Sequence, residues 1–90
     1  MIAIYMSGHA VGRTTESVLR ELATELEALR ARTGKLVDAY STTSVESAHA
    51  TIVLQAAKAG RAQRSKDAEI FLGLLEEAVR TGGTLRLEGE

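Results

Sequence analysis

The stretch IAIYMSGHAVGRTTES, from Ile2 to Ser17, decides how the rest of the chain is interpreted. Residues Ile2 to Met6 are apolar without alternation, which is typical of a strand covered on both faces. A short polar segment with two glycines and an arginine follows, and Thr14 or Thr15 offers a hydroxyl that can cap a helix. The stretch therefore predicts a buried strand, then a loop from Ser7 to Thr14, and then a helix.

Further along, the pattern switches between helical and extended. Apolar residues recur at helical spacing from Ser17 to about Arg32. Gly34 is suited to end that helix, because glycine readily adopts the left-handed conformation. Residues 35–41, KLVDAYS, predict a second, partly polar strand.

The second half of the chain predicts two helices and a strand. The capping box Thr43-x-x-Glu46 places a helix start near Ser44, and Gly60 ends or weakens that helix. Asp67 can cap a third helix, which ends at residues 82–83. Because the chain has no proline, one bent helix over residues 44–81 is an open alternative. Residues 84–88 alternate polar and apolar, as a strand with one solvated face does.

The resulting order is β-α-β-α-α-β, within a single α/β domain of residues 1–90. Alternation of this kind favours a three-stranded parallel sheet with helices on both faces. The most apolar strand is expected at the centre, which gives the spatial order 2-1-3. A ligand crevice in such a sheet lies at the carboxyl end of the first strand, where residues 7–14 follow.

Composition narrows the classes of function. The formal net charge is −1, so affinity for nucleic acid would have to come from a local patch. Aromatic residues make up 3% of the chain, which leaves few platforms for stacking bases. The chain has no cysteine, no signal-peptide pattern and no apolar stretch long enough to cross a bilayer. We therefore expect a cytoplasmic protein without membrane contact.

The first candidate site is the segment that follows the opening strand. Amide groups at a helix start together with an arginine could hold an anion or a nucleotide. The candidate residues for that site are Ser7, Gly8, Gly12, Arg13 and Thr14. The spacing departs from a phosphate-binding Walker loop, which needs a first glycine at Ser7 and a lysine at Arg13. The simpler interpretation, that the glycines allow a tight turn, is favoured.

No catalytic residue, metal ligand or cofactor is assigned. His9 and His49 stand alone in the sequence, without the neighbours that a ligand set or a general base would need. Ser7 has no identifiable base, and residues 76–77 form the solvated side of an amphipathic helix. The pattern therefore favours a protein that is not an enzyme.

The second candidate site is a basic segment, KAGRAQRSK, over residues 58–66. Its four cations could contact phosphates of a nucleic acid, with an affinity that falls as salt rises. The residues are Lys58, Arg61, Arg64 and Lys66. The alternative, a solvated connector whose charges pair with neighbouring acids, is favoured modestly.

Three stretches resemble the catalytic domain of serine recombinases, the resolvase and invertase family. IAIY resembles the first strand of that domain, and residues 25–40, ELEALRARTGKLVDAY, resemble its first helix and second strand. Residues 60–87 resemble the segment that leads to its third strand. The family follows the tyrosine with x-Arg-Val-Ser, in which serine is the nucleophile. Here Ser7 stands at the arginine position and His9 at the nucleophile position. The resemblance thus implies a reduced, inactive relative of phage or mobile-element origin.

A second resemblance concerns the same opening. IYMSGHAVGR is similar to the IYxxGxxxGR start of the nucleoside deoxyribosyltransferase and nucleotide N-glycosidase group. The carboxylates that this group uses come later, in a region without a counterpart here. The resemblance implies a nucleotide pocket at residues 7–14.

Three hypotheses of function follow. The first is a non-catalytic binding or assembly module, a homo-oligomer or part of a larger assembly, that could touch nucleic acid through residues 58–66. Exposed sheet edges and a stripe of small residues on the second helix favour it. The second is a small nucleotide-binding enzyme with its pocket at residues 7–14. The third is a protein inhibitor or structural subunit that contacts no nucleic acid.

Overall fold

The opening stretch forms a β-hairpin in the computed structural model, which describes residues 1–60 and 63–89. Strand β1 (Ile2–Met6) turns at Ser7 and Gly8 and returns as strand β2 (His9–Thr14). The φ angles are 54° at Ser7 and 81° at Gly8. Positive φ at both central residues is what a two-residue hairpin turn of the I′ type requires. Most of the segment predicted to be a loop is therefore a strand.

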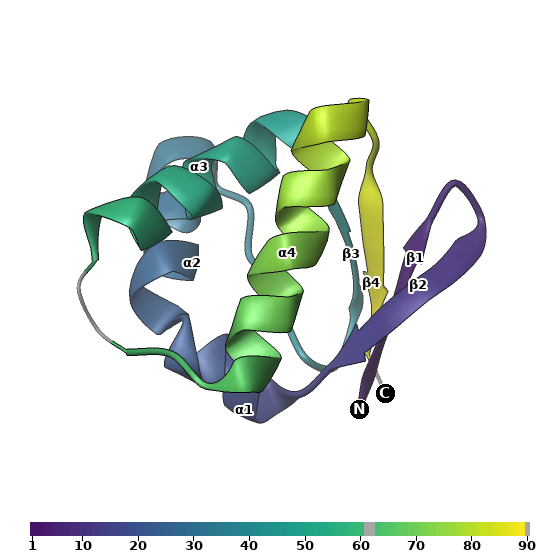
Figure 1. Cartoon of the computed structure of the whole chain (residues 1–90), viewed down its shortest axis with the longest axis horizontal. Coiled ribbons are helices and arrows are strands. Elements are labelled where there is room, and N and C mark those ends of the chain that lie inside the picture. The colour runs from purple at the N-terminus through teal and green to yellow at the C-terminus, as the bar shows by residue number, and fades with distance from the viewer. Residues whose placement is uncertain (61–62, 90) are drawn as a thin grey trace.

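In the part of the chain that the structure describes, six further elements follow the hairpin (Figure 1). They are α1 (Glu16–Glu21), α2 (Ala23–Thr33), β3 (Thr42–Val45), α3 (Ser47–Ala59), α4 (Lys66–Thr81) and β4 (Leu85–Glu88). The chain thus forms a small α/β domain, as predicted. Among the described residues, no helix combines the length and the apolar character needed to cross a membrane.

The four strands form one sheet in the order β2-β1-β4-β3, and every neighbouring pair is antiparallel. The prediction of a three-stranded parallel sheet in the order 2-1-3 is therefore wrong. The hairpin is the physical reason. A two-residue turn can only join antiparallel strands, so β1 is followed by a strand where the prediction placed a crossover helix. Because the described strand pairs are all antiparallel, the described residues contain no carboxyl end of a parallel strand at which the expected ligand crevice could form.

Residues 35–41 also differ from the prediction, because they form no strand. The third strand instead covers Thr42–Val45, where the start of a helix was expected. Thr43 and Val45 are buried, and Thr42 and Ser44 are exposed, which is the alternation of a strand with one solvated face. Helix α3 begins only at Ser47, after the N-cap Glu46.

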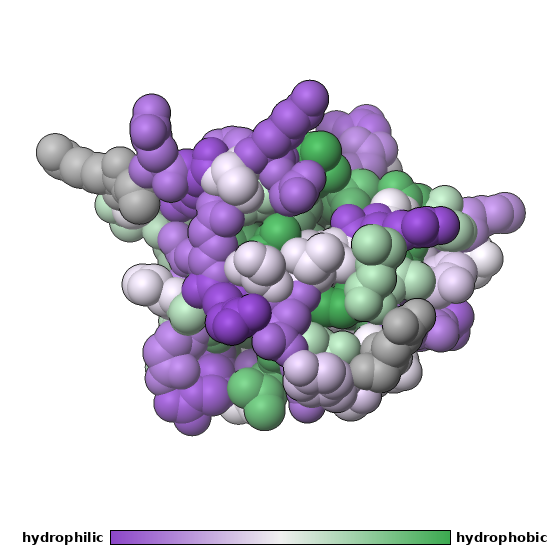
Figure 2. Space-filling view, turned by 90° about the horizontal axis from the view of Figure 1, so that it is seen from below, coloured by the Kyte–Doolittle hydropathy of each residue, from purple (hydrophilic) through white to green (hydrophobic). Residues whose placement is uncertain are grey.

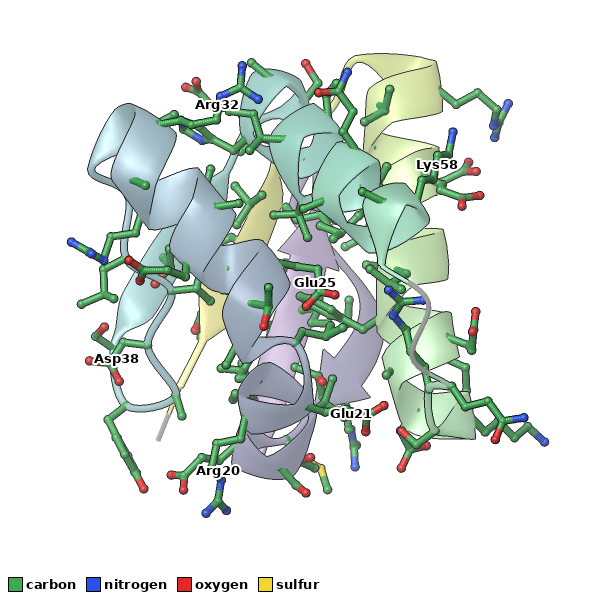
Figure 3. The ribbon with its side chains drawn as sticks, turned by 90° about the vertical axis from the view of Figure 1, so that its left-hand side faces the viewer. Arg20, Glu21, Glu25, Arg32, Asp38 and Lys58 are labelled. Carbon is green, nitrogen blue, oxygen red and sulfur yellow. The ribbon has the colours of Figure 1, made fainter. Side chains whose placement is uncertain are left out.

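The helices α1 to α4 lie on one side of the sheet, and none of the described elements covers its other side (Figures 1 and 3). The expectation of helices on both faces is therefore wrong as well. The inward side chains of the sheet pack against the apolar faces of the helices. The fully buried members with the largest side chains are Phe71, Ile2, Ile4, Leu22, Leu29, Leu75, Leu85 and Leu87. One hydrophobic layer thus holds the domain together.

The helix boundaries follow local signals. The predicted helix from Ser17 to Arg32 is divided at Leu22 into α1 and α2, and residues 44–81 hold two helices rather than one. Gly34 and Gly82 end their helices in the left-handed conformation, which confirms the prediction. The cap of α4 is Ser65, whose Oγ accepts a hydrogen bond from the Ala68 amide at 3.2 Å, so the choice of Asp67 was wrong.

Candidate functional site

A groove with a volume of about 500 Å³ lies between helices α1 and α2 and the irregular segment 35–41. Its walls are mainly apolar. The apolar residues that line it are Leu19, Ala23, Leu26, Leu36, Val37 and Ala39. Its rim is polar and charged, formed by Glu16, Arg20, Glu27, Arg30, Asp38 and Tyr40. The volume falls within the range of about 300–1,000 Å³ that is typical of ligand sites.

Helices α1 and α2 form one wall of the groove, and two local features of the sequence fix where they begin and break. Thr15 caps α1 through its Oγ1, which accepts a hydrogen bond from the Val18 amide at 3.3 Å. Helix α1 ends at Glu21, and the helical conformation breaks at the next residue, Leu22. The buried Leu22 side chain anchors this junction in the core. Leu19 and Leu26 stand on either side of this junction and face the segment 35–41 across the groove.

The opposite wall is held by hydrogen bonds rather than by a sheet ladder. Gly34 turns the chain back after α2 with a φ of 76°. The Tyr40 amide donates to Asp38 Oδ1 at 2.8 Å, which makes a local turn. The Tyr40 hydroxyl donates to the Glu16 carboxylate and so ties the segment to α1. Leu36 in the wall and Tyr40 in the rim remain 65% and 70% exposed, so carbon atoms of both residues face solvent at the mouth of the groove.

The charges of the rim are mostly paired within the chain. Arg20 lies 3.3 Å from Glu16, and the Arg30 Nε donates to Glu27 at 2.8 Å. The hydrogen bond from Arg30 lowers the pKa of Glu27, and the same bond raises the pKa of Arg30. The hydrogen bond to Glu16 raises the pKa of Tyr40. Because these pairs neutralise one another, the rim does not favour a highly charged ligand.

The rim of the groove lies at the surface of the molecule (Figure 3). Arg20 on α1 and Asp38 on the facing segment both lie on the outer side of the molecule (Figure 3). Figure 2 views the end at which both termini lie, where apolar residues are exposed in patches between hydrophilic side chains.

The structure brings only some residues of the first predicted site together. Ser7 and Gly8 form the hairpin turn, and Thr14 is the last residue of β2, so they lie at opposite ends of the sheet. Gly12 lies beneath Leu74, where an added Cβ would stand 2.9 Å from Leu74 Cδ1. Arg13 is exposed, and its guanidinium lies 3.8 Å from the Met1 sulfur. Arg13 and Thr14 both line a pocket beside the start of α1, whereas Ser7 and Gly8 lie at the far end of the hairpin.

The histidines also lie apart. His9 is exposed on β2, and the His49 Nδ1 accepts a hydrogen bond from the Glu46 amide at 3.3 Å, which caps α3. Within the described residues, no group of three or more histidine or acidic side chains could hold a metal ion.

The basic segment is divided by the structure. The Arg64 guanidinium donates to the Ala57 carbonyl at 2.8 Å and lies 3.3 Å from Glu25 on α2, with 14% of its side chain exposed. Arg64 therefore ties the connector to α2 and α3. Lys58 and Lys66 are exposed at the end of α3 and the start of α4, and Arg61 lies outside the described residues.

Sequence reasoning missed the groove because it treated residues 35–41 as a strand. One signal could have identified it. Asp38 lies shortly after Gly34, the residue that ends α2. An aspartate side chain often accepts a hydrogen bond from the amide two residues further on, here that of Tyr40, and this pattern predicts a turn.

Comparison with known proteins gives no match among family models, curated proteins or solved structures. The resemblances to serine recombinases and to nucleoside deoxyribosyltransferases stay predictions.

Proposed function

We propose that this protein is a non-catalytic binding module, and that its groove holds an apolar segment of a partner protein. The observation that carries the proposal is the groove itself, about 500 Å³ with apolar walls, between α1–α2 and segment 35–41. Binding of apolar side chains there would remove both their surface and that of the walls from water.

A protein segment suits the groove better than a small molecule. Sites for small molecules enclose most of the ligand surface. This groove is open to solvent, and Leu36 in its wall and Tyr40 in its rim are both largely exposed. An amphipathic helix buries one side only and leaves its polar side in water, as an open groove requires.

The described part of the basic segment gives less support to nucleic-acid contact. Arg64 is occupied by Glu25 and the Ala57 carbonyl, so its guanidinium would have to leave two partners to reach a phosphate. Lys58 and Lys66 are exposed, but two lysines bring little counterion release. The groove therefore carries the proposal.

The experiment measures binding of a fluorescently labelled, capped amphipathic peptide with leucines on one face. Fluorescence anisotropy gives its Kd for the wild type and for Ala23→Glu, which places a charge in the apolar wall. We expect Ala23→Glu to weaken binding by about tenfold or more, equivalent to about 1.4 kcal/mol.

A matched control is available on the same helix. Ala31 is exposed on α2 and does not line the groove, so Ala31→Glu should bind the peptide as the wild type does. A peptide of the same composition with scrambled leucines should bind weakly to all three proteins. Equal loss of binding in both variants, or none in either, would contradict the proposal.

A further inference from the structure

The uncovered side of the sheet carries a regular arrangement of side chains. In the strand register, Ala3 on β1 lies between Arg13 on β2 and Glu88 on β4. In the next outward row, Tyr5 lies between Ala10 and Arg86. Thr42 and Ser44 on β3 complete the two rows beside Glu88 and Arg86. We call these eight residues the open face.

The centre of the open face is suited to contact. Ala3, Ala10, Thr42 and Ser44 are small, so the surface around Tyr5 is shallow. The Arg86 guanidinium lies over the Tyr5 ring, 5.3 Å from its centroid, and 2.6 Å from the Glu88 carboxylate. These contacts hold the side chains of the open face in a defined arrangement before any partner binds.

The positions of Arg13 and Glu88 on either side of β1 allow a two-fold symmetric contact between two copies of the chain. Consider two copies whose open faces meet, related by a two-fold axis that lies between the two sheets and runs parallel to β1. This axis places β2 of one copy over β4 of the other, because these strands flank β1 on its two sides. Arg13 and Glu88 stand in the same row, each beside Ala3. Arg13 of each copy therefore meets Glu88 of the other, and the two Tyr5 rings meet near the axis.

We propose that the open face is a homodimer interface, formed by two copies packed sheet against sheet about this axis. A two-fold interface uses the same patch on both copies, so its charges must complement themselves, and the pair of Arg13 and Glu88 does so. Sheets pack face to face with their strands nearly aligned, which brings equivalent rows together. The Tyr5 pair adds an aromatic contact at the centre.

The dimer is independent of the proposed function. The groove lies among the helices, on the other side of the sheet, so a chain that dimerises can still bind a partner segment there. Failure of either proposal leaves the other standing.

The test is a pair of single charge reversals, followed by sedimentation equilibrium over a range of concentrations. Arg13→Glu makes both members of the pair acidic, and Glu88→Arg makes both basic. Each variant alone should dimerise at least about tenfold more weakly than the wild type, because like charges then face one another. Mixed in equal amounts, the two variants should form a heterodimer in which every facing pair is again opposite in sign.

Arg80→Glu, a charge reversal at an exposed position of α4 away from the open face, should dimerise as the wild type does. Circular dichroism on each variant establishes that it is folded. A wild type that stays monomeric at all concentrations would overturn the proposal. So would single variants that dimerise normally, or a mixture without heterodimer. A monomer that binds a single-stranded oligonucleotide, with that binding lost in Tyr5→Ala, would instead make the open face a stacking surface and also overturn it.

Discussion

At Gly89, the packing of β4 against segment 35–41, which forms one wall of the groove, requires a residue without a side chain. Its amide donates to the Ser41 carbonyl at 3.1 Å, which joins the end of β4 to the end of segment 35–41. An added Cβ would overlap the Ala39 carbonyl and lie 2.9 Å from the Ser41 nitrogen. The neighbours are backbone atoms and cannot move aside as a flexible side chain would. Glycine is thus required here for close approach, not for an unusual φ.

Gly89→Ala should therefore lower the free energy of unfolding by about 1–3 kcal/mol, since the overlap forces the backbone to shift. Gly73→Ala provides the control, because Gly73 lies within α4 and an added Cβ meets no atom within 4 Å. That change should stabilise the protein by about 0.5–1 kcal/mol through helix propensity. Urea unfolding followed by circular dichroism measures both. Equal effects of the two substitutions would show that the contact at Gly89 has no energetic role.

The ion pair of Arg64 and Glu25 is a second contact between single residues that stabilises the fold. Both side chains are largely buried, at 14% and 11% exposed, and they join the connector before α4 to α2. Glu25 points from α2 toward the interior in Figure 3. Removal of one partner leaves the other buried without its opposite charge.

Arg64→Met should destabilise the fold by about 2 kcal/mol, because a hydrogen-bonded charge loses its partner. Lys58→Met, at an exposed position, should change stability by less than about 0.5 kcal/mol. In a double-mutant cycle with Glu25→Gln, the two effects should be non-additive by about 1 kcal/mol. Strictly additive effects would mean that the two charges do not interact in the folded state.

At the scale of elements, the connector that leads into α4 is held to α1 and α2 by one acidic residue on each helix. Glu25 binds Arg64, and Glu21 Oε2 accepts a hydrogen bond from the Ser65 amide at 2.7 Å. The Ser65 amide lowers the pKa of Glu21, with smaller contributions from the Ser65 side chain and Arg64. The start of α4 is thus positioned by the helix pair that forms the groove.

Stability should depend on pH through Glu21. A carboxyl whose pKa is lower in the folded than in the unfolded state stabilises the fold above the unfolded pKa. That contribution is lost as pH falls through the folded pKa. The free energy of unfolding should therefore decline below the ordinary glutamate range, and it should decline less steeply in Glu21→Gln. Urea unfolding at a series of acidic pH values compares the two proteins, and parallel curves would contradict the assignment.

The elements also show what the sequence predicts and what it does not. The ends of the helices at Gly34 and Gly82 are predictable, because a local conformation decides them. So is β4, whose alternation reports a half-buried strand. Strand β2 was missed because Ser7-Gly8 is a weaker turn signal than Asn-Gly and because Val11 lies at an irregularity in the pairing. The groove was missed with it, since a predicted parallel sheet left no place for an irregular segment at residues 35–41.

At the scale of the whole molecule, one layer of helices on one side of an antiparallel sheet produces two distinct surfaces. The helical side carries the groove, and the other side carries the open face. We propose that the groove holds a partner segment and that the open face packs against a second copy of the chain. Such a domain could bring two identical partner segments together, one on each copy.

The most direct measurement of the central claim is an NMR map of the residues that respond when the capped amphipathic peptide is added. The amide shifts of Leu19, Ala23 and Tyr40, which lie on the two walls of the groove, should change in proportion to binding. Those of Tyr5 and Arg86 on the open face should stay as they are. Shifts confined to the open face, or spread evenly over the chain, would contradict the assignment of the groove as the binding site.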